Sequence, residues 1–297
     1  PAYDERVTMD KQKLTDLGEF YATQRISRGY TQDQVATKGL SKSQISNFEN
    51  GKHMLSASSL LLAIRGIHMS ANEFFYALNN YHATTIQVLT ARLIKIQESE
   101  DMAGASRLLK KAPKSSHDVL QNVMINSVIK EMTGHNQVTL REVNLVGNYL
   151  TSIDEWTEFE LSIFGFCIEI LDVGDVYWLA KEMLERTEFY SELVLNQHIV
   201  RRISLHVFAY MIVRDELAYA HYFRDQLKTL MHERWLTDWL RYNFLKKLLA
   251  FKLTKEPQLV GDMAASIDCL MMLDAKLLAK KLIKLLSATT DYAYKET

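Results

Sequence analysis

The sequence predicts an all-α protein built from more than one folding unit. Only three prolines and eleven glycines interrupt its 297 residues, and the alternating Val, Ile and Thr pattern typical of strands is nearly absent. Hydrophobic residues make up 47% of the chain, which is enough for a sizeable core, and the length exceeds that of one compact domain. We therefore expect two helical units, 1–80 and 81–297.

Targeting signals and disulfides are not expected. No run of eighteen apolar residues occurs, and the opening stretch PAYDERVTMD lacks the charged-then-apolar pattern of a signal peptide. This predicts a cytoplasmic protein with no membrane partner. Cys167 and Cys269 lie in apolar helical stretches, where reduced core thiols are expected. The net charge of −1 provides no global basic field for nucleic acid.

Five short helices are predicted in the first eighty residues. Thr31 and Ser41 precede the second and third helices as N-caps, and Gly39 is expected to adopt a positive φ in the turn between them. Two helices joined by so short a turn form a helix-turn-helix. Apolar spacing and stop signals place the helices at Lys11–Ser27, Gln32–Thr37, Lys42–Asn50, Ala57–Gly66 and Ala71–Leu78.

The stretch TQDQVATKGLSKSQISNFENGK resembles the helix-turn-helix of Cro/CI-type proteins. Val35, Ala36, Ile45 and Phe48 supply inward positions and leave a polar outward row. A recognition helix enters the major groove by its N-terminal end, where such side chains reach base edges. Residues 23–54 carry five basic and two acidic side chains, so the local charge is +3 (5 − 2). The resemblance implies base contacts from Lys42, Ser43, Asn47 and Gln44, and phosphate contacts from Gln32, Arg28 and Lys52.

Arg25 and Glu49 are given a structural role by the same resemblance. In Cro/CI-type proteins an Arg late in the first helix pairs with the Glu of the E-N-G sequence, and both positions are filled here. Such a bidentate pair fixes the recognition helix to the first helix without necessarily adding net stability. The alternative interpretation of the whole stretch is an ordinary capped helix followed by a glycine stop.

From Tyr81 onward the chain predicts a succession of helical hairpins that recur at roughly forty residues. Alternating long and short helices at this period are typical of a solenoid of tetratricopeptide type, although the individual repeats are degenerate. A last helix follows Asp274. The predicted hairpins are 116–133 with 138–151, 155–170 with 175–187, 196–213 with 216–231, and 235–253 with 258–273.

The order of a helix-turn-helix, the segment LLLAIRGIHMSANEFFYALNNY and repeats containing YLTSIDEWTEFELSIFG closely resembles the Rgg/GadR/MutR transcription regulators of streptococci and their relatives. The resemblance spans most of the chain, and the last hundred residues match only in their helical rhythm. It implies a homodimer in which the first unit binds palindromic or pseudo-palindromic promoter DNA. The repeat unit is implied to bind a short hydrophobic linear signalling peptide, as in quorum sensing, with RNA polymerase as a further partner.

Candidate peptide contacts follow from helix phase. A helical groove must offer amides to the peptide backbone and apolar pockets to its side chains. Taking Phe164 and Gly165 as packing positions points one row of side chains on each first helix toward the groove. An Arg in this row is suited to a peptide carboxylate. The candidates are Phe159, Ser162, Phe166 and Ile170; His198, Arg201, Leu205 and Phe208; and Asn122, Asn126, Asn196, Tyr242 and Asn243.

Alternative interpretations remain open for these residues. Phe159, Phe166 and Phe208 are more often solenoid core than pocket, and His198 is a candidate for titration near neutral pH. No histidine pair at i,i+4, phosphate-binding glycine loop or nucleophile elbow occurs, so no metal, cofactor or enzymatic activity is predicted. The alternative functions are a ligand-independent regulator whose repeats act as a protein-interaction scaffold, and a solenoid adaptor with a vestigial helix-turn-helix.

Overall fold

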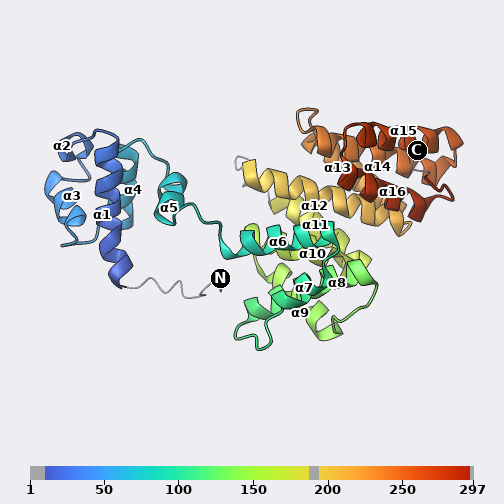
Figure 1. The fold of residues 1–297 in the computed structure, drawn as a ribbon, viewed down its shortest axis with the longest axis horizontal. Coiled ribbons are helices and arrows are strands. Elements are labelled where there is room, and N and C mark those ends of the chain that lie inside the picture. The colour runs from blue at the N-terminus through green and yellow to red at the C-terminus, as the bar shows by residue number, and fades with distance from the viewer. Residues whose placement is uncertain (1–10, 187–193, 295–297) are drawn as a thin grey trace. The chain divides into compact units, whose positions relative to one another are not determined.

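The chain divides into two compact units, 1–85 and 86–297, with the boundary five residues later than expected. The computed structural model describes residues 11–186 and 194–294 (Figure 1). Within these ranges every regular element is a helix, and one isolated bridge joins Thr37 to Leu40. The all-α prediction is confirmed.

The first unit contains five helices around a small core of its own. Tyr21, Ile45, Phe48 and Phe74 are fully buried in this core. The second helix is shorter than predicted, because the chain leaves the helical conformation at Ala36. The helices are α1 (Lys11–Ser27), α2 (Gln32–Val35), α3 (Lys42–Glu49), α4 (Ala57–Gly66) and α5 (Ala71–Leu78).

The turn between α2 and α3 corrects the expectation for Gly39. Thr37 and Leu40 exchange two backbone hydrogen bonds of 2.8 and 3.0 Å. Positive φ occurs at Gly51, which ends α3, and not at Gly39. A Cβ at position 39 would lie 2.9 Å from Leu62 Cδ1. A larger residue here would therefore displace only the end of the Leu62 side chain, and the backbone of the turn does not need the left-handed conformation.

Capping boxes fix the starts of α2 and α3. The Ser41 hydroxyl accepts from the backbone N–H of Gln44, and the Gln44 side chain accepts in return from the backbone N–H of Ser41. Thr31 and Gln34 form the same arrangement at α2. Each box satisfies backbone donors that have no partner within the helix. Both predicted N-caps are confirmed.

Gly18 sets how closely α1 approaches α3. A Cβ on this residue would lie 2.0 Å from the Phe48 carbonyl oxygen, far inside van der Waals contact. Glycine in a helix interior costs up to about 1 kcal/mol relative to alanine. Here the close passage of the two backbones accounts for its presence.

The second unit is a row of helical hairpins at nearly the predicted positions. It opens with α6 (Thr85–Ser99) and α7 (Met102–Leu108) and closes with α16 (Lys276–Thr289). One large core runs through the unit and includes Phe164, Phe208 and Phe244. Between its ends lie α8 (Ser116–Thr133) with α9 (Leu140–Ser152), α10 (Glu158–Cys167) and η1 (Ile168–Ile170) with α11 (Val173–Arg186), α12 (Val194–Val213) with α13 (Leu217–Leu230), and α14 (Leu236–Thr254) with α15 (Pro257–Met272).

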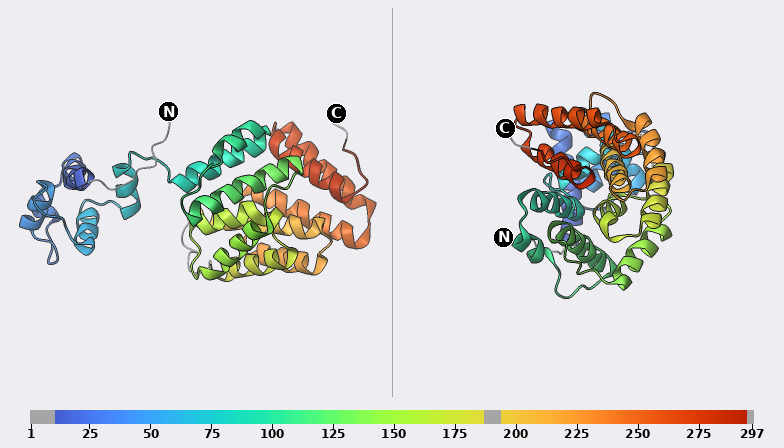
Figure 2. Two further views of the ribbon diagram at one scale, coloured as in Figure 1. Left: turned by 90° about the horizontal axis from the view of Figure 1, so that it is seen from below. Right: turned by 90° about the vertical axis from the view of Figure 1, so that its right-hand side faces the viewer.

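The first helices of the hairpins form one layer. In this first-helix layer α8 packs on α10, α10 on α12, and α12 on α14. The last helix, α16, packs against both α12 and α14, and Lys280 Nζ lies 2.7 Å from Glu100 Oε1 near the start of the unit. Figure 2 shows the helices of this unit following one another around an arc.

The two cysteines occupy different environments. Cys167 is buried as expected, and burial raises the pKa of its thiol. Cys269 is exposed on α15, so the expectation of a second core thiol is wrong. No helix within 11–186 or 194–294 is long and apolar enough to span a membrane.

Candidate functional site

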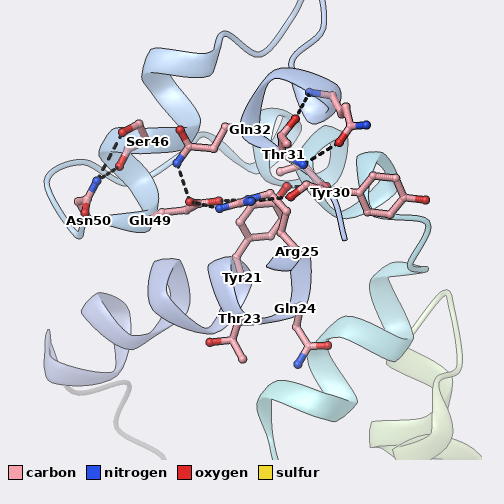
Figure 3. A network of polar contacts seen from close by, with 12 residues as sticks. Tyr21, Thr23, Gln24, Arg25, Tyr30, Thr31, Gln32, Ser46, Glu49 and Asn50 are labelled. Carbon is pink, nitrogen blue, oxygen red and sulfur yellow. Dashed lines mark hydrogen bonds and ion pairs between the residues drawn. The ribbon is translucent and has the colours of Figure 1, made fainter. Parts of the chain in front are cut away.

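A single carboxylate joins the first three helices of the first unit (Figure 3). Arg25 Nε donates to Glu49 Oε1 at 2.6 Å and Arg25 Nη2 donates to Glu49 Oε2 at 2.7 Å. Gln32 Nε2 donates to the same Oε2 at 2.7 Å. Both ion-pair side chains are less than a tenth exposed, and the hydrogen bond to Glu49 raises the pKa of Arg25. The network therefore fixes α3 against α1 and α2.

Gln32 was expected to contact phosphate. In the structure one hydrogen of its side-chain amide is used by Glu49. An amide nitrogen carries two hydrogens, so one donor remains for a second acceptor. The bond to Glu49 thus holds the remaining donor in place at the first position of α2.

The predicted outward row of α3 lies at the surface. Lys42, Ser43 and Gln44 are exposed, and Asn47 is half-buried. Lys42 Nζ contacts Asp33 Oδ2 at 2.7 Å, with both side chains more than half exposed. Such a surface pair contributes less than about 1 kcal/mol, so Lys42 can exchange Asp33 for another anion at low cost.

Gln44 differs from its neighbours because its capping role occupies its oxygen. Oε1 accepts from the backbone N–H of Ser41 at 2.8 Å and from the Ser41 hydroxyl at 2.9 Å. The amide nitrogen is left as a donor. The bidentate contact by which Gln recognises adenine needs both the amide oxygen and the amide nitrogen. In this conformation Gln44 can therefore donate only to a hydrogen-bond acceptor on a base.

The two predicted flanking phosphate contacts are also exposed. Arg28 Nη1 donates to Gln24 Oε1 at 2.7 Å and to the Gln24 carbonyl oxygen at 3.2 Å, so the side chain lies along its own helix end. Lys52 follows α3 and its side chain is exposed. Arg28, Lys42 and Lys52 are thus three exposed cationic side chains of the first unit.

In the repeat unit, the face of α12 that reaches the surface is offset by one residue from the predicted one. Leu205 and Phe208 are completely buried and Arg201 is 3% exposed, because they pack between neighbouring helices. The prediction that this row faces a groove is therefore corrected. The surface row has the same helical spacing and consists of Arg202, His206, Ala209 and Val213.

On α10 only part of the predicted row is accessible. Phe166 is half-buried, whereas Ser162 and Ile170 are buried, and the Ser162 hydroxyl donates to its own helix at the Glu158 carbonyl. The half-buried Phe159 ring packs 4.8 Å from His117. Phe166 remains a candidate for an apolar floor, and the other three have structural contacts.

The asparagine and tyrosine candidates for peptide binding differ in whether their polar atoms already have hydrogen-bond partners. Asn122 exchanges two hydrogen bonds with the Lys110 backbone, Tyr242 donates to the Arg224 carbonyl at 3.0 Å, and Asn243 donates within its own helix. Asn126 is different, because its Oδ1 is buried and has no hydrogen-bond partner. The Asn196 side chain lies outside the described part of the structure.

The accessible residues of three neighbouring first helices are grouped under the name open face. We use this name for Asn126, Phe166, Arg202, His206 and Ala209, which are partly or fully exposed on α8, α10 and α12. Close to them, Lys130 Nζ donates to the Glu169 carbonyl at 2.7 Å, and His206 Nε2 lies 3.8 Å from the Glu169 carboxylate. Contact with His206 lowers the pKa of Glu169, with Arg214 acting in the same direction.

His198 sits beside this face in contact with Arg201, at 3.3 Å from Nδ1 to Nη2. Burial lowers the pKa of His198, Asp238 opposes this effect, and Arg202 and Arg201 add to it. The charging of the imidazole is therefore displaced to more acidic pH.

One hollow was not predicted from the sequence. A cavity of about 330 Å³ lies between α9 and α11, and Trp178 on its rim is 60% exposed. An apolar residue facing outward on a second helix gives no recognisable sequence signal. The cavity is lined by Val143, Asn144, Gly147, Asn148, Thr151, Asp175, Trp178, Leu179 and Glu182. No group of three metal-ligating side chains occurs in the described ranges.

Two family models match the chain, one within each compact unit. Residues 22–74 match a helix-turn-helix model, which includes α2 to α4 and the whole outward row. Residues 105–284 match the model described as the C-terminal domain of the HTH-type transcriptional regulator Rgg. The second match spans more than half of the chain.

Solved structures show the same fold. The SHP pheromone receptor Rgg2 from Streptococcus dysgalactiae is 19% identical, with a TM-score of 0.74 over 92% of this chain and 100% of that one. The PrgX/iCF10 complex is 14% identical, with a TM-score of 0.67 over 93% and 96%. A bacterial peptide pheromone/receptor complex is 14% identical, with a TM-score of 0.63 over 92% and 98%.

Proposed function

Because this chain belongs to the Rgg family of helix-turn-helix transcriptional regulators, we propose that it is a cytoplasmic homodimer that reads promoter DNA and responds to a short hydrophobic peptide. The observation that carries this proposal is the combination of an exposed polar α3 with a repeat unit that matches the family's C-terminal domain. Transcription regulation is not an enzymatic role.

For DNA recognition, α3 enters the major groove. Lys42, Ser43 and Asn47 contact base edges, and Gln44 donates to a base or phosphate acceptor. One such helix reads a half-site, so a homodimer is paired with a palindromic or pseudo-palindromic operator. The phosphate contacts that set the register come from Arg28, Gln32 and Lys52.

The open face is the proposed peptide site. An extended peptide presents backbone N–H and C=O groups, and the side-chain amide of the half-buried Asn126 is the group of this face that pairs with them. Phe166 and Ala209 offer apolar surface to its side chains. The similar proteins named as a pheromone receptor and a peptide pheromone/receptor complex support a peptide ligand.

Peptide binding acts by population shift. A peptide that binds one arrangement of the repeats more tightly increases the population of this arrangement. The change in arrangement is transmitted to the two helix-turn-helix units of the dimer. The output is a change in operator binding or in recruitment of RNA polymerase.

Fluorescence anisotropy with promoter duplexes from beside the gene tests DNA reading. We expect salt-dependent binding, and Asn47→Ala should weaken binding to the preferred duplex by about 1–3 kcal/mol and reduce sequence preference. Lys42→Ala should also reduce affinity. The control Lys111→Ala/Asn144→Ala changes exposed residues of the repeat unit. Unchanged binding by Lys42→Ala/Asn47→Ala would contradict the assignment of α3.

Calorimetry with short hydrophobic peptides encoded beside the gene tests ligand binding. Heat release together with a raised unfolding temperature is expected, because a ligand that binds only the folded state stabilises it. Absence of both effects with every peptide would favour repeats that act as a protein-interaction scaffold.

A further inference from the structure

The cavity of about 330 Å³ lies between the second helices of two neighbouring hairpins, whereas the open face is formed by first helices. Each of the two helices lines the cavity with residues at the spacing i, i+3, i+4 and i+7, which share one side of a helix over two turns. The cavity is therefore an elongated groove that extends for about 10 Å along the helices. Its two rows are Asn144, Gly147, Asn148 and Thr151 on α9, and Asp175, Trp178, Leu179 and Glu182 on α11.

The lining of this groove is acidic. Asp175 and Glu182 are its charged members, and they stand at opposite ends of the α11 row. No lysine, arginine or histidine within the described ranges lines the groove. Lys181, the neighbour of Glu182 in sequence, has its ammonium group 3.8 Å from the Glu185 carboxylate and 5.3 Å from the Trp178 ring centroid. Two carboxylates without a cationic side chain in the same walls give the groove an attraction for positive charge.

Between the two carboxylates the walls of the groove are uncharged. Val143, Trp178 and Leu179 supply apolar surface. Asn144 and Asn148 are exposed, and their side-chain amides make no hydrogen bond with any residue in the described ranges. Their oxygens can therefore accept hydrogen bonds from a ligand. These walls suit a ligand that is apolar in its middle and carries a hydrogen-bonding cation at each end.

Gly147 keeps the α9 wall of the groove open. A Cβ at this position would meet nothing within 4 Å, and the φ of Gly147 is not positive. Glycine in a helix interior costs up to about 1 kcal/mol relative to alanine. Neither a left-handed backbone nor close packing accounts for glycine here, whereas an unobstructed groove does.

We propose that this groove binds a linear aliphatic polyamine, with one ammonium group at Asp175 and another at Glu182. The carbon chain between the ammonium groups lies on Trp178 and Leu179. Ammonium groups only donate hydrogen bonds, so the carboxylate and amide oxygens of the walls match them. Because α9 and α11 come from neighbouring hairpins, the bound polyamine ties two repeats together and stabilises the repeat unit. The site is separate from the peptide site and does not depend on it.

Titration calorimetry of the full chain at low salt, with 1,8-diaminooctane and 1-aminooctane as probes, tests the site. The diamine should bind about tenfold more tightly than the monoamine, because only the diamine reaches both carboxylates. Asp175→Asn/Glu182→Gln should remove this difference. The matched control Glu98→Gln/Asp291→Asn removes one Glu and one Asp charge from exposed positions elsewhere in the unit, and it should keep the difference.

Gly147→Leu tests the groove itself, because it fills the space and retains both carboxylates. It should abolish binding of the diamine. Leucine is a better helix former than glycine, so the unfolding temperature should stay the same or rise, which separates blocked binding from misfolding. Gly261→Leu is the control, since Gly261 is exposed on α15 with open space around its Cβ position, and it should bind the diamine as the parent does.

Three results would overturn the polyamine site. The first is absence of diamine binding, or equal affinity for the diamine and the monoamine. The second is diamine binding that survives in Gly147→Leu or a diamine preference that survives in Asp175→Asn/Glu182→Gln. The third is displacement of the diamine by an equal concentration of Mg²⁺, which would show only a general attraction of cations to an acidic surface. DNA and peptide binding are measured separately, so each of these results leaves the proposed function standing.

Discussion

At the scale of single residues, Gln44 has two tasks that one substitution can separate. Its oxygen completes the capping box of α3 and its amide nitrogen is free to donate. Gln44→Glu retains an acceptor for Ser41 and removes the donor. We expect thermal stability within about 0.5 kcal/mol of the parent and a clear loss of DNA affinity, because a carboxylate now faces phosphates and base acceptors.

Gln34→Glu is the control for this prediction, since Gln34 completes the equivalent box of α2 with Thr31. It adds the same charge outside the α3 row. Equal loss of DNA affinity in both variants would show that charge alone matters and that Gln44 makes no specific contact. Anisotropy titrations and thermal unfolding of the same samples decide this.

Asp118 predicts a pH dependence of repeat-unit stability. Lys110, at 2.6 Å, lowers the pKa of the Asp118 carboxyl to about 2, aided by the Lys114 and Ser115 backbone N–H groups. The folded pKa lies below the unfolded value of 3.8, so the unfolded state binds more protons as pH falls. The stabilisation is complete above about pH 4 and disappears as pH falls through about 2.

Asp118→Asn should therefore cost about 1 kcal/mol at pH 7, where a charged cap and ion pair are lost, and almost nothing near pH 2. Denaturant titrations of parent and variant across this pH range measure the difference. A difference that stays constant with pH would show that the charge of Asp118 does not stabilise the unit.

The exposure of residues in the helix-turn-helix unit was predictable, because the capping and spacing patterns that determine it are local in sequence. The spacing of Ser41, Gln44 and Asn47 within one short helix determines which side is capped and which faces outward. The exposed face of α12 in the repeat unit was not predictable to the same degree. Whether Arg201 or Arg202 faces outward depends on Asp238, which lies 37 residues later in the chain. No local pattern in α12 encodes that partner.

At the scale of elements, the crossing of α1 and α3 depends on Gly18. Gly18→Ala adds a methyl group where the Phe48 carbonyl already fills the space, and the backbone must shift. We expect a loss of about 1–3 kcal/mol in stability of the first unit, together with weaker DNA binding as α3 is displaced. Thermal unfolding and anisotropy titrations measure the two effects.

Gly261→Ala is the matched control, because Gly261 lies inside α15 with open space around its Cβ position. Relieving the helical cost of glycine should leave stability unchanged or raise it by up to about 1 kcal/mol. If Gly18→Ala behaves in the same way, close passage of α1 and α3 does not restrict that position.

Helix positions were largely predictable from sequence, since caps and stop signals are short-range. Most predicted hairpin ends fall within a few residues of those observed, and α2 ends early because Thr37 and Leu40 pair with each other. Packing distances were not predictable. The proximity of Leu62 to Gly39, and of Phe48 to Gly18, arises from chain segments that meet only after folding.

At the scale of the whole molecule, the two units have separate cores. Differential scanning calorimetry should therefore resolve two transitions. Ile45→Ala should lower only the transition temperature of the first unit, and Leu248→Ala only that of the second. Each substitution should reduce the free energy of unfolding of its unit by roughly 2–5 kcal/mol, because each residue is fully buried in one core. A joint shift of both transitions by either substitution would contradict independent folding.

The contact between Lys280 and Glu100 changes how the repeat unit can deform. Packing runs from α7 through α8, α10, α12 and α14 to α16, and this ion pair returns from α16 to Glu100, which directly follows α6. The repeat unit is thus a closed ring of packed helices, completed by the Lys280–Glu100 ion pair. Widening the space between two helices must therefore be compensated by a shift elsewhere in the ring. Lys280 and Glu100 are both more than half exposed, so water and salt weaken their attraction and the ion pair opens readily. A ligand that widens the gap between two first helices would therefore be accommodated first by opening of the Lys280–Glu100 pair.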